Sequence, residues 1–243
     1  MRRCLAAAAV LLAAAAAAGQ ETQKAKPPAF VGEKLRYDMT ILGLPAGEVV
    51  LSAEPDDLEG RPAYRLEMTI ETDEVISKLF LVRDRLTSWI DPETLTSLCF
   101  HKHTVEGRRV REETITFDLD RLMARRGEKV IPITPPVFDS LSSVYFVRTL
   151  PLDGRDEVEL SVVSKDAFRL KIEVQGRQTV TTPAGTFSTI RVEPKSPGEN
   201  LIGKGRNLVL WLTDDERRLP VQIKSRLAVG TLVGKLKSIE LPR

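Results

Sequence analysis

The mature part of this chain has a single cysteine and no excess of charge of either sign, and both shortages limit what it can be. Of two cysteines among 243 residues, Cys4 lies in the N-terminal segment discussed below, so Cys99 is left without an intramolecular partner. Stability must therefore come from a hydrophobic core and not from disulfides. Removal of residues 1–18 takes away two of 36 basic residues and none of the 34 acidic ones, which leaves a formal net charge of zero. That balance argues against a nucleic-acid-binding protein.

The chain also lacks a hydrophobic run long enough to span a membrane comfortably, and its N-terminal run is typical of a secretory signal peptide. Residues 1–18 place Arg2 and Arg3 before an uncharged, alanine-rich stretch from Leu5 to Ala18. A basic start, a short apolar segment and small residues at its end are the parts of such a signal. No cysteine directly follows the stretch, so we expect no lipid-anchoring site. We expect cleavage after Ala18, a periplasmic or secreted location, and no transmembrane anchor in the mature chain.

A single domain is expected after a short leader. Residues 19–29 are polar and proline-ended, which is typical of a disordered leader. From residue 30 to residue 241 the chain has no repeat, no long linker and no low-complexity block. A segment of this length is enough to bury one core, so residues 30–241 are predicted to form one β-rich domain.

Alternation of apolar and polar residues dominates this domain. In residues 63–71 every second residue is apolar and those between are charged or polar, as in a strand with one solvated side. Residues 157–163, 167–174 and 220–227 repeat the pattern, and turn residues separate such runs at short spacing. We predict roughly 11 to 14 antiparallel strands joined as hairpins and meanders.

One segment has helical spacing instead. Asp139 is suited to be an N-cap, Leu141, Val144 and Tyr145 recur at i, i+3 and i+4, and Pro151 closes the pattern. This predicts a helix of about three turns.

The fold class follows from the two patterns together. A sheet with one apolar face must be covered or must curl on itself. We therefore expect an all-β, mainly antiparallel fold with one short helix, in which a long curved sheet closes partly into a barrel around the helix. A second short helix over residues 73–80 has weaker support.

The two histidines are weak candidates for metal ligands. Cys99, His101 and His103 fall on one face of a predicted strand, and two histidines at i and i+2 can bind one zinc or copper ion. Cys99 and His103 would lie about 13 Å apart, so both cannot reach one ion without a bend. We predict an ordinary, partly exposed strand face, no metal site and no cofactor.

A serine nucleophile is not predicted. Ser140, Ser142 and Ser143 follow Asp139, but the chain has no G-x-S-x-G motif and no histidine close in sequence. These residues are better explained as the cap and first turn of the helix.

Two pairs of carboxylates could in principle carry acid–base chemistry, namely Asp84 with Asp91 and Asp214 with Asp215. Residues 91–95 and 213–220 read as turns, where acidic residues are favoured for local hydrogen bonds. No catalytic residue is therefore assigned.

A basic group alternates with glutamates in the middle of the chain, as in a solvated strand surface. An alternative is contact with anionic headgroups or acidic glycans. The group consists of Arg108, Arg109, Arg111, Arg121, Arg125, Arg126 and Lys129.

Five short motifs, in order along the chain, resemble the DUF3108 family of exported bacterial domains. They are FVGEKLRYDMTILGLPAGEVVL, VRDRLTSWID, FDSLSSVYFVR, VTTPAGTFSTIRV and VLWLTDDERRLPVQI. The residues that we take as structural markers of the resemblance are Gly32, Glu33, Tyr37, Gly47, Asp84, Asp139, Gly185, Trp211, Asp214 and Pro220. The resemblance implies a predominantly β envelope protein without a characterised activity, so it assigns no catalytic role.

Several of these marker residues have a structural explanation. Residues 43–47 combine two glycines with a proline and are predicted to form a hairpin connection. Trp211 is expected to fill core volume, and Asp214 to pair with Arg218 across the following turn.

Three functions remain open from the sequence. The preferred one is a non-enzymatic binding module whose curved sheet holds a lipid or another apolar ligand. If the helix fills the concave face, a structural partner in envelope assembly becomes the better hypothesis, acting through an edge strand or a surface patch. An enzyme acting on envelope polymers would need converging carboxylates, for instance Glu33, Asp84 or Asp139.

Overall fold

The computed structural model describes residues 27–195, 208–227 and 230–241, and the statements below concern those residues. The predicted signal peptide, and all but the last three residues of the predicted leader, lie outside them. No helix of the described part is long and apolar enough to cross a membrane.

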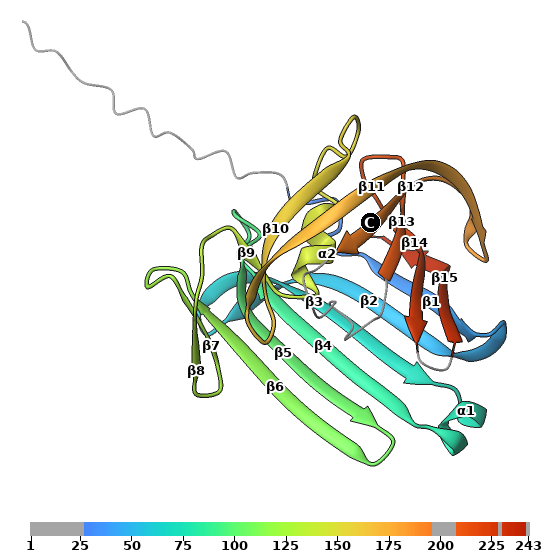
Figure 1. Ribbon diagram of the computed structural model, residues 1–243, viewed down its shortest axis with the longest axis horizontal. Helices are drawn as coiled ribbons and strands as arrows, with labels where there is room; N and C mark the ends of the chain where they lie inside the picture. Colours follow the sequence, from blue (N-terminus) through green and yellow to red (C-terminus); the bar gives the residue numbers. More distant parts are fainter. Residues whose placement is uncertain (1–26, 196–207, 228–229, 242–243) are drawn as a thin grey trace, which may run out of the picture.

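Fifteen strands form a single sheet (Figure 1). The first eight are β1 (Lys34–Ile41), β2 (Leu44–Leu58), β3 (Arg61–Thr72), β4 (Val82–Ile90), β5 (Ser97–Glu106), β6 (Arg109–Asp118), β7 (Met123–Arg126) and β8 (Lys129–Pro132). The others are β9 (Val137–Phe138), β10 (Glu157–Val163), β11 (Ala167–Thr182), β12 (Gly185–Lys195), β13 (Leu208–Thr213), β14 (Pro220–Leu227) and β15 (Gly230–Glu240). Two short helices complete the described elements, α1 (Glu74–Leu79) and α2 (Ser142–Val147).

The strand order follows the sequence in two runs that meet in the middle of the sheet. From one edge it runs β8 to β1, continues with β15, and returns to β9 at the other edge. The first and last strands are therefore neighbours, with Lys34 opposite Glu240. All pairs are antiparallel except β9 with β10. The mostly-β, mainly antiparallel prediction is confirmed, with 15 strands where fewer were expected and two helices where one was expected.

The sheet is open in the described part of the chain, because no ladder joins the edge strands β8 and β9. The edge strand β8 nevertheless contacts the β10–β11 turn through one side chain. The Nζ of Lys129 donates to the backbone oxygen of Lys165 at 2.9 Å and pairs with Asp166.

Helix α2 lies between the two halves of the curved sheet (Figure 1). Tyr145 packs into a core cluster formed mainly by β1 to β6, whereas Val147 packs into a second cluster built on β10 to β13. A short helix with apolar residues on opposite sides thus supplies contacts to both halves. The two clusters follow from the predicted alternation, since the inward residues of each strand are the apolar ones.

The prediction of three turns for α2 was wrong. The helix has six residues, its N-cap is Leu141, and no side chain caps it. Asp139 instead accepts the backbone N–H groups of Leu141 and Ser142 at 2.8 and 3.0 Å in the turn before the helix. Its carboxylate is also tied to the sheet, as described below, which fixes where the helix can begin. The weaker helix over residues 73–80 is confirmed as α1, with Asp73 as its N-cap.

The glycine-rich stretch turns the chain, as predicted, but in a tighter turn than predicted. Leu42 and Gly43 form the connection with φ of 53° and 82°, and residues 44–47 already belong to β2. Gly47 serves a separate purpose. Its φ is 150°, and a Cβ at this position would lie 2.0 Å from the backbone oxygen of Glu71 in β3. Only glycine permits this approach between the two strands.

Candidate functional site

A cavity of about 480 Å³ lies on the concave face of β5, β6 and β7. Alternation along β5 explains its position, because Lys102, Thr104 and Glu106 share a face with Phe100, which is buried in the core. Arg111 of β6 lies opposite Thr104 in the sheet. The side chains that line the cavity are polar or charged, and those used below are Lys102, Thr104, Glu106, Arg111, Glu113 and Arg126.

Ion pairs hold most of these charges in place. Arg126 donates to Glu113 at 2.5 Å, and Arg111 lies 3.7 Å from Glu106. Lys102 lies opposite Glu113 in the ladder but has no ion pair in the part of the chain that the structure describes. The cavity therefore offers one ammonium group whose charge is not engaged by a direct partner.

Asp84 lies beside Thr104, which lines the cavity, and has a perturbed pKa. It lies opposite Thr104 in the β4–β5 ladder, and its carboxylate accepts the backbone N–H of Val105 at 3.2 Å. Partial burial is the main cause of a raised pKa for Asp84, and the charge of Glu106 adds to it, while Lys102 opposes it. Perturbed carboxyl groups in a recess often mark a binding or catalytic site.

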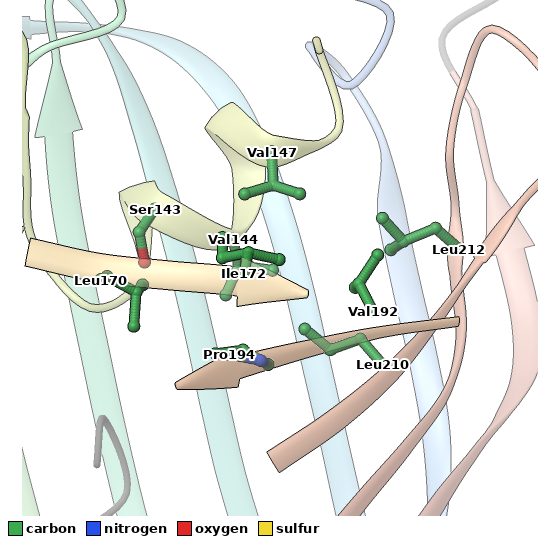
Figure 2. Close-up of a pocket in the computed structure, with 9 residues that line it drawn as sticks. All are labelled: Ser143, Val144, Val147, Leu170, Ile172, Val192, Pro194, Leu210 and Leu212. Atoms are coloured by element: carbon green, nitrogen blue, oxygen red, sulfur yellow. The ribbon is translucent and has the colours of Figure 1, made fainter. Parts of the chain in front are cut away.

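Helix α2 fills the apolar space against β11 to β13. Val144 and Val147 of the helix face Leu170, Ile172 and other apolar side chains of β11 to β13 (Figure 2). The space left between them has a volume of about 10 Å³, which is room for no more than one water molecule.

Asp139 is the centre of a buried polar cluster that anchors the chain before α2. Its Oδ2 accepts hydrogen bonds from the hydroxyls of Ser88 and Ser97 at 2.5 and 2.7 Å. The hydroxyl of Ser142 lies 2.8 Å from that of Ser97, and all four side chains are buried. The serines therefore satisfy a structural carboxylate, in keeping with the helix-start interpretation of Ser142.

Glu33 and Arg148 form a buried ion pair. The two guanidinium Nη atoms of Arg148 donate to the two carboxylate oxygens of Glu33 at 2.5 and 2.7 Å, and neither side chain is more than 1% exposed. The guanidinium also lies over the rings of Tyr145 and Phe30, at 5.2 and 5.7 Å from their centroids. Burial lowers the pKa of Arg148, but the hydrogen bonds and charge of Glu33 outweigh burial and raise it. The pair joins the residue before β1 to the end of α2.

Glu33, Asp84 and Asp139 do not converge on one cleft. Glu33 is bound to Arg148, Asp139 is bound to serines, and of the three only Asp84 lies beside a residue that lines the cavity. The enzyme hypothesis thus lacks the buried facing carboxylates that it needs among these three residues.

The other predicted carboxylates occupy turns. Asp91 accepts the backbone N–H groups of Glu93 and Thr94 at 3.0 and 2.9 Å, and Asp215 does the same for Arg217 and Arg218. These contacts are the local hydrogen bonds expected of acidic turn residues.

Asp214 lies 4.0 Å from Arg218, at the limit of an ion pair, and its stronger contact is with Arg177 at 2.5 Å. Trp211 is buried, as expected of a core residue. Its indole has Lys224 and Arg191 near the ring, at 5.2 and 5.8 Å from the centroid.

The remaining marker residues have structural roles. Gly32 precedes β1 with a φ of 87°, and Gly185 has a φ of 138° where β12 begins. The Tyr37 hydroxyl donates to the backbone oxygen of Pro220 at 2.7 Å, and burial raises the pKa of Tyr37 well above its usual value. This bond ties β1 to β14 across β15.

The histidines lie on the face of β5 opposite Phe100. His101 and Glu112 are joined by a contact of 2.9 Å between Nε2 and Oε1. Within the described ranges no three or more His, Cys, Asp or Glu side chains are grouped so as to hold a metal ion.

The sequence interpretation missed the cavity. It followed the histidines along residues 97–106 and gave no role to the alternate positions. The signal was present in the same stretch, because Phe100, Lys102 and Thr104 change from apolar to polar along one face. Nothing local indicates that this face is the concave one.

Comparison with solved structures supports the fold. One match is the crystal structure of a β-barrel-like protein of domain of unknown function DUF1849 from Brucella abortus. It covers 90% of this chain and 100% of that chain, with a TM-score of 0.65 and 9% sequence identity. At this identity the likeness concerns the fold alone. No curated protein matches the chain.

Comparison with family models supports the resemblance of the five motifs. The model described as protein of unknown function (DUF3108) matches residues 36–237, which is most of the chain. It therefore extends from β1 to β15 and includes the cavity, both helices and eight of the ten marker residues. The chain belongs to the DUF3108 family.

Proposed function

We propose that this protein is a non-enzymatic binding module of the bacterial envelope that holds one amphiphilic lipid on the concave face of its sheet. The supporting observation is a row of inward-facing residues that crosses β3 to β6. The row begins with the apolar Met68 and Leu86 and ends with the charged Lys102 and Glu113. An amphiphile has the same division, so its apolar chain would lie over β3 and its headgroup in the cavity.

The next row along the strands has the same division. Ile70 of β3 is followed by Asp84, Thr104 and Arg111. Met68 and Ile70 are only partly buried, so they offer apolar surface beside the polar cavity. A volume of about 480 Å³ lies within the range of small-molecule sites. The charges fix the headgroup, and the apolar row supplies affinity.

A binding role is favoured over a catalytic one because most charged side chains of the cavity are held in ion pairs. Glu113 is held by Arg126 and Glu106 by Arg111, so these groups orient a ligand more readily than they transfer protons. Thr104 lies opposite Asp84, but no hydrogen bond joins their side chains in the described structure.

Export and partial closure of the sheet belong to the same proposal. The signal-peptide pattern of residues 1–18 directs the chain to the periplasm or beyond. The contact of Lys129 with the β10–β11 turn brings the two ends of the sheet together over the cavity, and we infer that the curved sheet closes partly around α2 through it.

A structural partner in envelope assembly is the second candidate. A helix that fills the concave face was expected to favour this hypothesis, and α2 fills the apolar space against β11 to β13. The two candidates differ in what the purified protein carries.

The test is native mass spectrometry of the mature protein purified from its own periplasm, followed by organic extraction and lipid analysis. A bound species of defined mass that is lost in Lys102→Ala supports the proposal. The matched control is Arg125→Ala, since Arg125 lies opposite Thr116 on the convex face and should leave the bound species in place. A protein that stays free of lipid, even after incubation with an extract of envelope lipids, would contradict the proposal and favour the structural partner.

A further inference from the structure

One end of the sheet carries an unusual concentration of exposed apolar side chains. Nine large hydrophobic residues are exposed in the described part of the chain, and six of them lie at this end with 54% to 84% of their surface accessible. We call these six the apolar rim. They are Leu42, Leu44, Val75, Leu79, Phe80 and Val110.

The six residues of the rim lie on or beside three connections at the same end of the antiparallel sheet. They are the β1–β2 turn, α1 between β3 and β4, and the β5–β6 turn. Figure 1 shows α1 and the β5–β6 turn at this end of the molecule.

Backbone contacts join these connections. The N–H of Gly107 in the β5–β6 turn donates to the oxygen of Leu81, and the N–H of Asp73 donates to the oxygen of Ala46, at 2.7 and 3.2 Å. The start of β2, α1 and the β5–β6 turn are therefore neighbours at this end of the sheet.

Helix α1 shows that the rim is not an ordinary protein surface. None of its residues is buried, although Val75, Ile76 and Leu79 make up half of its six positions. A surface helix normally turns its apolar residues to the core. Here Ile76 is only partly buried and Val75 and Leu79 are exposed, and exposed apolar patches of this kind mark contact surfaces.

The charged residues around the rim indicate what kind of surface it binds. Lys78 of α1, Arg108 and Arg109 have no ion pair in the described structure. Among the nearby acidic groups, Glu106 pairs with Arg111 and Glu71 lies 3.9 Å from Arg83. Asp73 and Glu74 have no ion pair in the described residues, although Asp73 caps α1. Three unpaired cations against two unpaired carboxylates leave α1 and the β5–β6 turn positive overall.

We propose that the apolar rim docks this protein on an anionic lipid surface. The six apolar side chains enter the interface between headgroups and acyl chains, while Lys78, Arg108 and Arg109 contact the lipid phosphates. Apolar side chains at the tips of separate turns, bordered by unpaired cations, fit a deformable lipid surface better than a rigid protein partner. Docking on a lipid surface is a separate property from holding a single lipid in the cavity. The two sites are close, because Glu106 lines the cavity and is the last residue of β5 before the β5–β6 turn.

The test is co-sedimentation of the chain from residue 19 with vesicles of phosphatidylcholine, with and without phosphatidylglycerol. We expect binding to the anionic vesicles that weakens as salt is raised. Leu79→Asp, and the pair Arg108→Glu with Arg109→Glu, should each lower binding by about tenfold or more. These residues are exposed, so the variants should fold, and circular dichroism verifies it.

Matched controls use residues outside the rim. Leu122→Asp removes an exposed leucine and Arg125→Glu reverses an exposed charge, and both should bind as the unchanged protein does. Equal binding by rim and control variants would overturn the proposal, and so would absence of binding to either vesicle. Self-association that Leu79→Asp abolishes would also overturn it, because the rim would then be an interface between copies. Lys102 lies in the cavity and not in the rim, so Lys102→Ala should leave vesicle binding intact. The rim proposal and the lipid-carrier proposal can therefore fail independently.

Discussion

Replacement of Arg148 by methionine should cost about 3–5 kcal/mol of unfolding free energy, because it leaves the Glu33 carboxylate buried without its partner. The two side chains are at most 1% exposed and share two hydrogen bonds. The substitution also removes a hydrogen bond of 3.2 Å to the backbone oxygen of Arg217 and the contacts over the Tyr145 ring. Domains of this size are stable by about 5–15 kcal/mol, so the loss would be a large part of the total.

The same reasoning predicts recovery when both charges are removed. Glu33→Met together with Arg148→Met replaces the pair by apolar side chains of similar length, and such replacements of buried pairs are often neutral or stabilising. The control is Arg65→Met, which breaks an exposed pair with Glu54 at 2.9 Å and should cost about 1 kcal/mol or less.

Urea unfolding followed by tryptophan fluorescence measures all three variants, with Trp89 and Trp211 as probes. If Arg148→Met lowers the free energy of unfolding no more than Arg65→Met does, the Glu33–Arg148 pair does not behave as a buried ion pair. If the double variant is as unstable as the single variant, the cost comes from lost packing and not from the uncompensated charge.

Three further predictions concern single residues, each checked by urea unfolding. Gly47→Ala should lower the free energy of unfolding by about 2–4 kcal/mol, because the added Cβ would collide with the backbone of β3. Gly43 has open space around it, so Gly43→Ala should lower it by about 1 kcal/mol. Equal losses would contradict the close approach at Gly47. Asp139→Asn should cost about 1–3 kcal/mol because an amide cannot accept from both serine hydroxyls and both N–H groups, and a neutral result would show that the cluster is not needed. The pKa of Asp84 is raised, so the free energy of unfolding should fall as pH rises from the ordinary pKa of 3.8 through the pKa in the folded protein. Asp84→Asn should remove that fall, and superimposed pH curves of the two proteins would refute this.

Local chemistry was enough to predict much of the fold. The strand over residues 63–71 was recognised because alternation is a property of consecutive residues, and it lies within β3. The turns at Asp91 and Asp215 were recognised because each carboxylate bonds backbone groups two and three residues ahead. The short helix over residues 73–80 was also expected, and Asp73 caps it through the N–H groups of Val75 and Ile76. In all these cases the partner lies within a few residues.

The end of α2 shows where local chemistry was insufficient. Helical spacing alone would continue to Pro151, but the chain ends the helix at Val147. Arg148, the next residue, is held by Glu33, which lies 115 positions earlier. A contact at that separation has no local signature, because either residue would look the same in a solvated turn.

The sequence by itself determined the strands, the turns, the family and the alternation that separates polar from apolar faces, since all of these depend on neighbours in the chain. Only the tertiary structure decided that Lys102, Thr104 and Arg111 face a concave cavity and that Val75 and Leu79 of α1 are exposed. The physical reason is that an alternating strand has two equivalent faces until the curvature of the sheet makes one of them the inside.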